Sequence, residues 1–341
     1  MKKATLDRPT EQTATTMVAM VQDRYGDEPE DVLHLGAVPT PTAGDDQVLV
    51  RVHAAGVDRG VWHVMAGLPY PIRLGGYGLR APKCPVPGMD MAGVVDAVGK
   101  GVTRFQPGDE VFGIGKGSYA EYALALEDKL APKPANLSFQ QAAAVAVSGL
   151  TALQALRDHG KVQPRDKVLV VGASGGVGTY AVQLGKAFGA HVTGVCSTTK
   201  LDLVRSIGAD RVIDYTADDF AAGAQRYDVI VDIGGNATLS RLRRALTPKG
   251  TLVIVGGETD GRLLGGFDRQ VRALLLSPFV GQKLGTFVCS ENHEDMLVLK
   301  ELIDAGNITP VIDRTYALGQ APAAIRYVKD GRARGKVVIT V

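Results

Sequence analysis

A glycine-rich turn in the middle of the chain carries the clearest chemical signal. The apolar run 167–171 enters Gly172-Ala173-Ser174-Gly175-Gly176-Val177-Gly178, and the helix-like segment 179–188 leaves it. Glycines there let the backbone approach a pyrophosphate, whose charge sits on free N–H groups at the start of the helix. Tight turns also use glycine for their own geometry, but here a second apolar strand, 190–196, follows. This context predicts a dinucleotide site contacted by Ser174, Gly175, Gly176, Val177 and Gly178.

The end of the second strand indicates which dinucleotide binds. A fold specific for NAD normally ends this strand in Asp or Glu, which bonds the ribose 2′-hydroxyl. Here the segment 195–200 reads Val-Cys-Ser-Thr-Thr-Lys, so hydroxyl groups and a cation replace the acid. A cation favours the charged 2′-phosphate, and we therefore predict NADPH, held by Ser197 and Lys200. In the alternative interpretation, Ser197 caps the next helix and Lys200 is a solvated surface residue.

Further cofactor contacts follow from the later strands of this region. Ligands of a parallel sheet lie at the carboxyl ends of its strands. The strand ends therefore add five predicted contacts, which are Gly234, Val255, Gly256, Phe287 and Val288. Arg332 and Arg334 precede the last strand, where they either reach the phosphates or are two solvated arginines.

Length, charge and cysteine content limit the class of protein. The 341 residues suggest two domains, and 38 basic against 36 acidic residues give a net charge of +2, which implies no nucleic-acid partner. No apolar stretch reaches membrane-spanning length, and the polar segment 1–16 lacks the apolar core of a signal peptide, so we interpret it as a disordered leader. Three widely spaced cysteines argue against a disulfide framework and fit a cytoplasmic location.

The pattern of strands and helices changes near residue 138. Short strands punctuated by Gly and Pro precede Ser138, which is a predicted helix N-cap, and alternating strands and helices follow it. That alternation is typical of a doubly wound parallel sheet. We therefore predict a β-rich domain from residues 17–137 and 290–341, which includes a returning terminal strand, and a nucleotide-binding domain from residues 138–289.

Seven short phrases, taken in order, resemble the medium-chain dehydrogenase/reductase superfamily over residues 17–341. The phrases occupy residues 54–58, 87–95, 107–113, 118–122, 149–152, 172–178 and 335–338. The resemblance implies an α/β fold with a GroES-like β-rich catalytic domain and a doubly wound Rossmann domain. It also implies that Thr151 lies near the nicotinamide carboxamide and that Tyr215 packs near the 2′-phosphate. It is also consistent with a homodimer that pairs through the strand near 284–288.

Within this superfamily, the chain resembles the zinc-free quinone oxidoreductase branch, because other residues occupy the positions of the zinc ligands. Zinc-dependent members carry Gly-His-Glu where this chain has Gly88-Met89-Asp90, and a Cys where it has Asp58. A methionine and a single aspartate cannot form the Cys/His/Glu type of site that a catalytic zinc needs. We therefore predict that no metal is bound.

The absence of a Lewis acid narrows the predicted reaction. Hydride transfer belongs to the cofactor, and nothing would stabilise the alkoxide of a plain alcohol. A quinone or an α,β-unsaturated carbonyl spreads the incoming charge, so hydrogen-bond donors suffice. We therefore predict NADPH-dependent reduction of such small-molecule acceptors. The alternatives are an NADPH-binding sensor with little turnover and an NAD(P)-dependent alcohol dehydrogenase.

Candidate catalytic residues lie between residues 58 and 70. His63 has the chemistry to deliver a proton, and Tyr70 is a second candidate. Quinone reductases carry an Asn near the position of Asp58, which here would either orient His63 or pair with Arg59. A lone histidine is also consistent with a packing role. The Gly- and Pro-rich segment 75–83 is predicted to form a mobile lip over the substrate.

Overall fold

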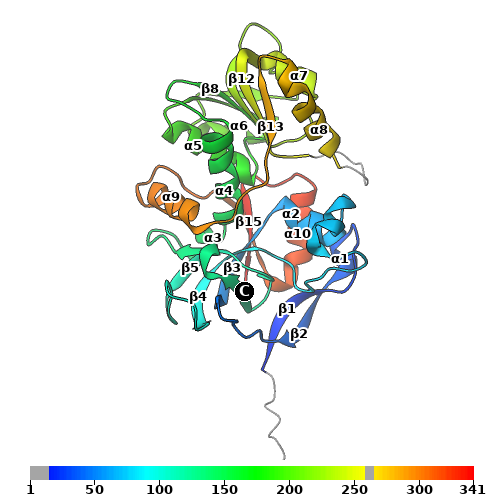
Figure 1. Cartoon of the computed structure of the whole chain (residues 1–341), viewed down its shortest axis with the longest axis vertical. Coiled ribbons are helices and arrows are strands. Elements are labelled where there is room, and N and C mark those ends of the chain that lie inside the picture. The colour runs from blue at the N-terminus through cyan, green and yellow to red at the C-terminus, as the bar shows by residue number, and fades with distance from the viewer. Residues whose placement is uncertain (1–14, 258–264) are drawn as a thin grey trace, which may run out of the picture.

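The computed structural model describes residues 15–257 and 265–341 and places two large β-sheets in separate halves of the molecule (Figure 1). Residues 1–14 of the predicted leader lie outside the described residues, whereas Thr16 already begins strand β1 (Thr16–Gln22) and is therefore not part of a leader. Within the described ranges, no helix is long and apolar enough to cross a membrane.

The β-rich half occupies the lower part of Figure 1 and holds a seven-stranded sheet in the order β14-β15-β3-β4-β5-β7, with β6 paired to β3. These strands are β3 (Gln47–Val57), β4 (Asp90–Val98), β5 (Glu110–Ile114), β6 (Tyr122–Leu126), β7 (Leu130–Pro132), β14 (Ile312–Ala317) and β15 (Lys336–Thr340). Val48, Val50 and Val52 alternate along β3 and are buried, as one core-facing side of a strand requires. A separate antiparallel pair joins β1 to β2 (Leu33–Pro39). This is the predicted GroES-like fold.

The upper half is a six-stranded parallel sheet in the order β10-β9-β8-β11-β12-β13. Its strands are β8 (Lys167–Val171), β9 (His191–Cys196), β10 (Arg211–Asp214), β11 (Tyr227–Asp232), β12 (Leu246–Ile254) and β13 (Lys283–Thr286). The apolar runs of the central strands are buried because helices cover both faces. The strand order reverses between β8 and β11, which is the switch point where α/β sheets bind ligands. The predicted doubly wound Rossmann domain is therefore confirmed.

Helices cover the sheets and connect the two halves. The helices are α1 (Pro29–Val32), α2 (Arg59–Ala66), α3 (Phe139–Ala142), α4 (Ala146–Gln154), α5 (Gly176–Ala187), α6 (Leu201–Ser206), α7 (Leu239–Ala245), α8 (Phe267–Leu276), α9 (His293–Asp304) and α10 (Ala321–Lys329). Ser138 caps α3 as predicted, since its hydroxyl accepts a hydrogen bond from the N–H of Gln141 at 3.3 Å. One cluster of buried apolar side chains runs from Phe112 through Leu150 to Val168 and packs the two halves together.

The last strand brings the two halves together at the glycine-rich turn. β15 pairs antiparallel with β3, with Val337 opposite Val57. Immediately before it, the N–H of Gly335 donates to the carbonyl oxygen of Ser174 at 2.8 Å. The C-terminal strand therefore belongs to one sheet, while Gly335 just before it is hydrogen-bonded to the glycine-rich turn of the other.

The contact between α5 and the turn gives a test of this packing. A Cβ atom on Gly178 would lie 2.1 Å from the carbonyl oxygen of Gly172, which is backbone and cannot move aside cheaply. We expect Gly178→Ala to lower the free energy of unfolding by about 1 to 3 kcal/mol through this overlap. Denaturant unfolding measures the change.

Gly60→Ala is the matched control, because Gly60 is also helical and a Cβ atom there meets no atom within 4 Å. This variant should unfold at the same denaturant concentration as the wild type or slightly higher. A Gly178→Ala protein as stable as the Gly60→Ala protein would contradict the packing described.

Candidate active site between the two domains

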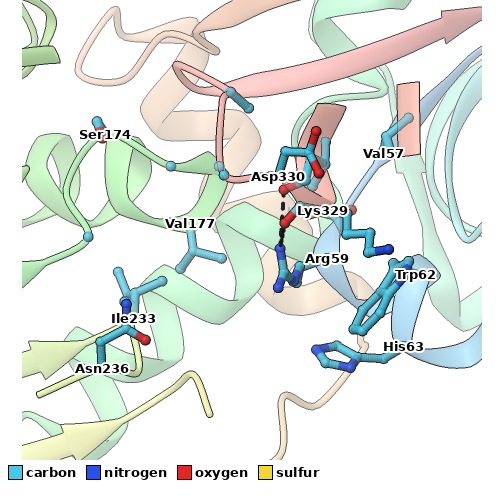
Figure 2. A pocket seen from close by; sticks show the side chains of 18 of the residues that line it. Val57, Arg59, Trp62, His63, Ser174, Val177, Ile233, Asn236, Lys329 and Asp330 are labelled. Atoms are coloured by element: carbon cyan, nitrogen blue, oxygen red, sulfur yellow. Dashed lines mark hydrogen bonds between the residues drawn. The ribbon is translucent and has the colours of Figure 1, made fainter. Parts of the chain in front are cut away.

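A cleft of about 860 Å³ lies between the glycine-rich turn and the β-rich domain (Figure 2). Its lining comes mainly from three segments, which are the turn 172–177, the segment 57–63 that ends β3 and begins α2, and the segment 328–335 that leads from α10 into β15. The Arg59 guanidinium ties two of these segments together, since it donates to the carbonyl oxygens of Val328 and Lys329. Both domains therefore contribute to the cleft.

The glycine-rich turn has the shape that a pyrophosphate needs. Gly172 has φ of 88°, in the left-handed region, and a Cβ atom on it would lie 2.9 Å from the nitrogen of Gly234. Gly175 is the N-cap of α5, and no side chain caps that helix. A Cβ atom on Gly175 would have the carbonyl oxygen of Gly172 as its nearest neighbour, at 3.7 Å, so its open side has room for a ligand. The predicted contacts 174–177 line the cleft, whereas Gly178 is not among its lining residues.

Lys200 lies in the short turn that follows β9, where the sequence predicts the 2′-phosphate. Lys200 lines the cleft, and its Nζ donates to the carbonyl oxygens of Gly331 and Ala333, each at 2.8 Å. Burial, together with the nearby Arg334, lowers the pKa of Lys200 from its usual value. The side chain of Ser197 makes no capping hydrogen bond, so the alternative in which it caps a helix lacks that contact.

Of the other predicted cofactor residues, one lines the cleft and the rest do not. Gly234 lines it, whereas Tyr215 is exposed beside Cys196, whose carbonyl oxygen accepts its N–H. Arg332 forms an ion pair with Asp330 at 3.2 Å. Five more predicted contacts are absent from the lining residues, and these are Thr151, Ser197, Val255, Gly256 and Arg334.

The strand end after β13 is also turned away from this cleft. The ring of Phe287 stacks on His159 with centroids 4.3 Å apart, and Val288 is 95% exposed. Thr151 donates its hydroxyl to the carbonyl oxygen of Val147 at 2.7 Å, which is an ordinary helical side-chain bond.

His63 lies on the cleft wall beside Trp62 (Figure 2). Its Nδ1 is 3.0 Å from the carbonyl oxygen of Leu68. Because a carbonyl oxygen only accepts hydrogen bonds, Nδ1 carries a hydrogen. In the neutral ring Nε2 is then an acceptor, and His63 could give a proton from Nε2 only as an imidazolium.

Tyr70 is not among the residues that line this cleft. It is 42% exposed, and the guanidinium of Arg73 lies 5.0 Å from its ring centroid. The structure therefore does not bring Tyr70 to the wall that carries His63.

Asp58 lines the cleft, but its charge is paired differently from the sequence prediction. Its Oδ1 accepts hydrogen bonds from Nζ of Lys336 at 2.6 Å and from the hydroxyl of Ser148 at 3.0 Å. The same Nζ donates to Oδ2 of Asp90 at 2.8 Å. The predicted pairing with His63 or Arg59 is thus replaced by a buried cluster of Asp58, Asp90, Ser148 and Lys336.

Strand register explains how residues so far apart in sequence meet. Asp58 directly follows β3, while Asp90 and Lys336 begin the two strands that flank β3. Gly56 leaves the room that they need, since a Cβ atom there would lie 2.7 Å from Oδ2 of Asp90. Ser148 reaches the cluster from α4.

Burial and pairing set the charges of the cluster. Burial raises the pKa of Asp58, but Lys336 and the hydrogen bonds around the carboxyl outweigh it, so the pKa lies below its usual value. Burial dominates at Asp90 and, with the Asp58 charge, raises its pKa well above the usual value. Burial lowers the pKa of Lys336, but both carboxyl groups raise it, and the net shift is upward. These directions favour the ionised form of Asp58, the neutral form of Asp90 and the charged form of Lys336.

A second cavity of about 560 Å³ lies on the opposite face of α2. Val61 and Val64 of that helix line it, together with Met89 and Ile114 from the β-rich domain. Several residues of the predicted lip, among them Tyr77 and Lys83, also line it. Its mostly apolar wall suits an uncharged ring or chain.

Comparisons with known proteins agree with this architecture. Residues 44–135 match the family described as "Alcohol dehydrogenase GroES-like domain", and residues 207–339 match "Zinc-binding dehydrogenase". The chain is 31% identical to the chloroplastic quinone-oxidoreductase QR1 of Triphysaria versicolor, over 95% of this chain and 98% of that one. The chain belongs to the quinone oxidoreductase-like branch of the medium-chain dehydrogenase/reductase superfamily. It is therefore related throughout its length to oxidoreductases.

Two further relatives indicate the chemistry found in this superfamily. The chain is 34% identical to the 2-methylene-furan-3-one reductase of Solanum lycopersicum, over 91% of this chain and 76% of that one. The solved structure of a mycobacterial protein in complex with NADPH superimposes with a TM-score of 0.81 at 26% identity, over 96% of this chain and all of that one. A nicotinamide cofactor fits the cleft of this oxidoreductase through the open glycine turn and Lys200.

The zinc named in one family description does not fit the residues of this oxidoreductase. No group of three or more His, Cys, Asp or Glu side chains that could hold a metal occurs among the described residues. At the positions where zinc-dependent members carry ligands, Asp58 and Asp90 share the ammonium of Lys336 instead. Met89 offers only a weak thioether at the third position. Lys336 is also the residue that sequence reasoning missed, because a lysine at the start of an apolar strand has the pattern of a strand end.

We expect purified protein to contain no stoichiometric zinc, because Lys336 already supplies the positive charge between the two carboxyl groups. Elemental analysis measures the metal content, and thermal unfolding with and without a chelator measures its effect on stability. The unfolding temperature should not change. One tightly held zinc per chain, with stability lost on chelation, would contradict the assignment.

Proposed function

We propose that this protein is a zinc-independent oxidoreductase that transfers hydride from NADPH to a quinone or an α,β-unsaturated carbonyl. The observation that carries the proposal is Lys200, which follows β9 on the wall of the cofactor cleft and whose ammonium donates to the carbonyl oxygens of Gly331 and Ala333. That arrangement favours the 2′-phosphate of NADPH over the free hydroxyl of NADH. The complex of a mycobacterial relative with NADPH supports the same choice.

The proposed acceptor follows from the site chemistry. Bound NADPH supplies the hydride, and this chain has to bind and orient the acceptor and accommodate the charge that develops on it. The ammonium of Lys336 lies between Asp58 and Asp90, so these carboxyl groups are not available to hold a metal that would act as a Lewis acid on a plain alcohol. A conjugated acceptor spreads the charge over its own atoms. The apolar second cavity and the names of the quinone-oxidoreductase and furanone reductase relatives support this acceptor class.

Three further properties remain proposals. The free state of Cys84, Cys196 and Cys289 suits a reducing compartment, and we propose the cytoplasm. We also propose a homodimer that pairs through β13, since that strand is at the edge of the nucleotide sheet. His63 remains a candidate proton donor from the wall of the cleft.

Lys200→Ala tests the cofactor choice. Removing a charge-assisted phosphate contact should weaken NADPH binding by about 1.5 to 3 kcal/mol, whereas NADH binding should hardly change because NADH has no 2′-phosphate. Fluorescence titration with both nucleotides measures the two affinities. Equal losses for NADPH and NADH would instead indicate that the 331–333 loop has moved.

Lys249→Ala is the control, because Lys249 is exposed and lies outside the cleft lining. Its affinities for both nucleotides should match the wild type. The preference for NADPH would be refuted by a wild-type protein that binds NADH as tightly as NADPH. The acceptor class is tested by NADPH oxidation with a simple quinone, an enone and a plain ketone, of which the ketone should be the poorest.

A further inference from the structure

The buried cluster around Lys336 contains two carboxyl groups but one ammonium group. Oδ1 of Asp58 and Oδ2 of Asp90 lie 2.6 and 2.8 Å from the same Nζ, and the side chains of Lys336 and Asp90 are 1% and 0% exposed. With every group ionised, one negative charge would remain uncompensated in the interior, which is costly. One proton shared by the two carboxyl groups removes that charge.

The surroundings of the cluster add no second cation. Tyr119 and Tyr180 face it, but their hydroxyls donate to the carbonyl oxygens of Gly56 and Ala144, and burial raises the pKa of both phenols well above the usual value. Among the described groups that touch Asp58 or Asp90, Ser148 and the N–H of Val147 are neutral donors. The carboxyl pair must therefore hold its own proton.

The two carboxyl groups differ in depth. Asp90 is enclosed and accepts the N–H of Val147 at 2.8 Å, whereas Asp58 is 15% exposed and lines the cleft. Burial raises the pKa of the fully enclosed Asp90 well above its usual value, whereas at Asp58 the charge of Lys336 helps to outweigh burial and the pKa lies below its usual value. At rest the proton thus belongs to the deeper group, and the group in contact with the cleft is its acceptor.

We propose that Asp58 and Asp90 store one proton and that Asp58, at the cleft wall, delivers it to the anion left on the acceptor by hydride transfer. This inference rests on the proposed function. Asp58 is then a catalytic residue, and Asp90 is a positioning residue that acts through it. Quinone reductases with an Asn near the position of Asp58 lack this second carboxyl.

The step balances in atoms and charge. Hydride carries two electrons from NADPH to the β-carbon of an enone, which oxidises the cofactor to NADP⁺ and leaves an enolate. Asp58 accepts the stored proton from Asp90 and passes it to the enolate oxygen, which forms an O–H bond and leaves both carboxyl groups ionised beside Lys336. The enol then tautomerises to the ketone, and water in the cleft returns one proton to the pair.

His63 is less suited to this role at rest. The hydrogen on its Nδ1 is directed to the carbonyl oxygen of Leu68, so the neutral ring has only an acceptor at Nε2. The carboxyl pair, by contrast, holds its proton before the cofactor binds. The proposal can therefore be tested in the ligand-free protein.

The first test is infrared spectroscopy of ligand-free protein at neutral pH. The wild type should show the C=O stretch of a buried protonated carboxyl. In Asp58→Asn, Asp90 pairs one-to-one with Lys336 and ionises. The band should therefore be absent from the spectrum of this variant. Asp90→Asn should remove it too, because Asp58 then pairs alone with Lys336. Asp128→Asn, at an exposed position, is the control and should keep the band. A band that survives in both cluster variants, or no band in the wild type, overturns the stored proton.

The second test compares two acceptors. A quinone can take its protons from water after reduction, whereas an enolate needs a proton before the product leaves. Asp58→Asn should therefore lower the ratio of enone to quinone turnover by about 10²- to 10⁴-fold. A purely structural defect would lower both rates alike and leave the ratio unchanged, which would overturn delivery by Asp58. A selective loss in His63→Ala instead would assign the donor to His63.

Failure of the proposed function has a separate signature. Wild-type protein that oxidises NADPH with neither acceptor would refute the reductase and with it the delivery step, whatever the infrared result. Wild-type protein that reduces both acceptors, with an unchanged ratio in Asp58→Asn, would refute only the proton delivery.

Discussion

The ammonium of Lys336 between Asp58 and Asp90 is the interaction on which the site depends. It links three neighbouring strands of the β-rich sheet, and Gly335 beside it is hydrogen-bonded to Ser174 of the glycine-rich turn. Removing Lys336 would leave two buried carboxyl groups without a cation, and breaking a buried ion pair in this way is strongly destabilising. The position of the glycine-rich turn relative to the cleft wall that carries Asp58 therefore depends on the charge balance around Lys336.

The ammonium of Lys336 also bears on which acceptor the site can reduce, because it lies where zinc-dependent members hold their metal. Where zinc-dependent members of the superfamily hold a divalent ion, this oxidoreductase has the ammonium of Lys336, which is hydrogen-bonded to Asp58, Asp90 and Ser148. Such a cation cannot coordinate a substrate oxygen as a metal does. An acceptor that spreads its own charge suits this site, and the apolar cavity beside Met89 suits the same kind of molecule.

Local sequence was sufficient to predict the glycine-rich turn and the position of Lys200 on the cleft wall. The strand, glycine turn and helix of residues 167–188 are contiguous, so their geometry follows from short-range rules, and Lys200 was placed by its position after the next strand. The Asp58–Lys336 pair could not be found in this way, because 278 positions separate the two residues and strand register alone brings them together. The strand-end rule also does not specify where a side chain points, as the exposed Val288 and the stacked Phe287 demonstrate.

The central claim is direct hydride transfer to a conjugated acceptor without a metal. Reduction of an enone by NADPH that carries deuterium on the transferred position of C4, with chelator-treated protein, tests it most directly. The account predicts one deuterium bound to the β-carbon of each product molecule, found by mass spectrometry and NMR. An unlabelled product, or labelling that appears only after zinc is added back, would contradict it.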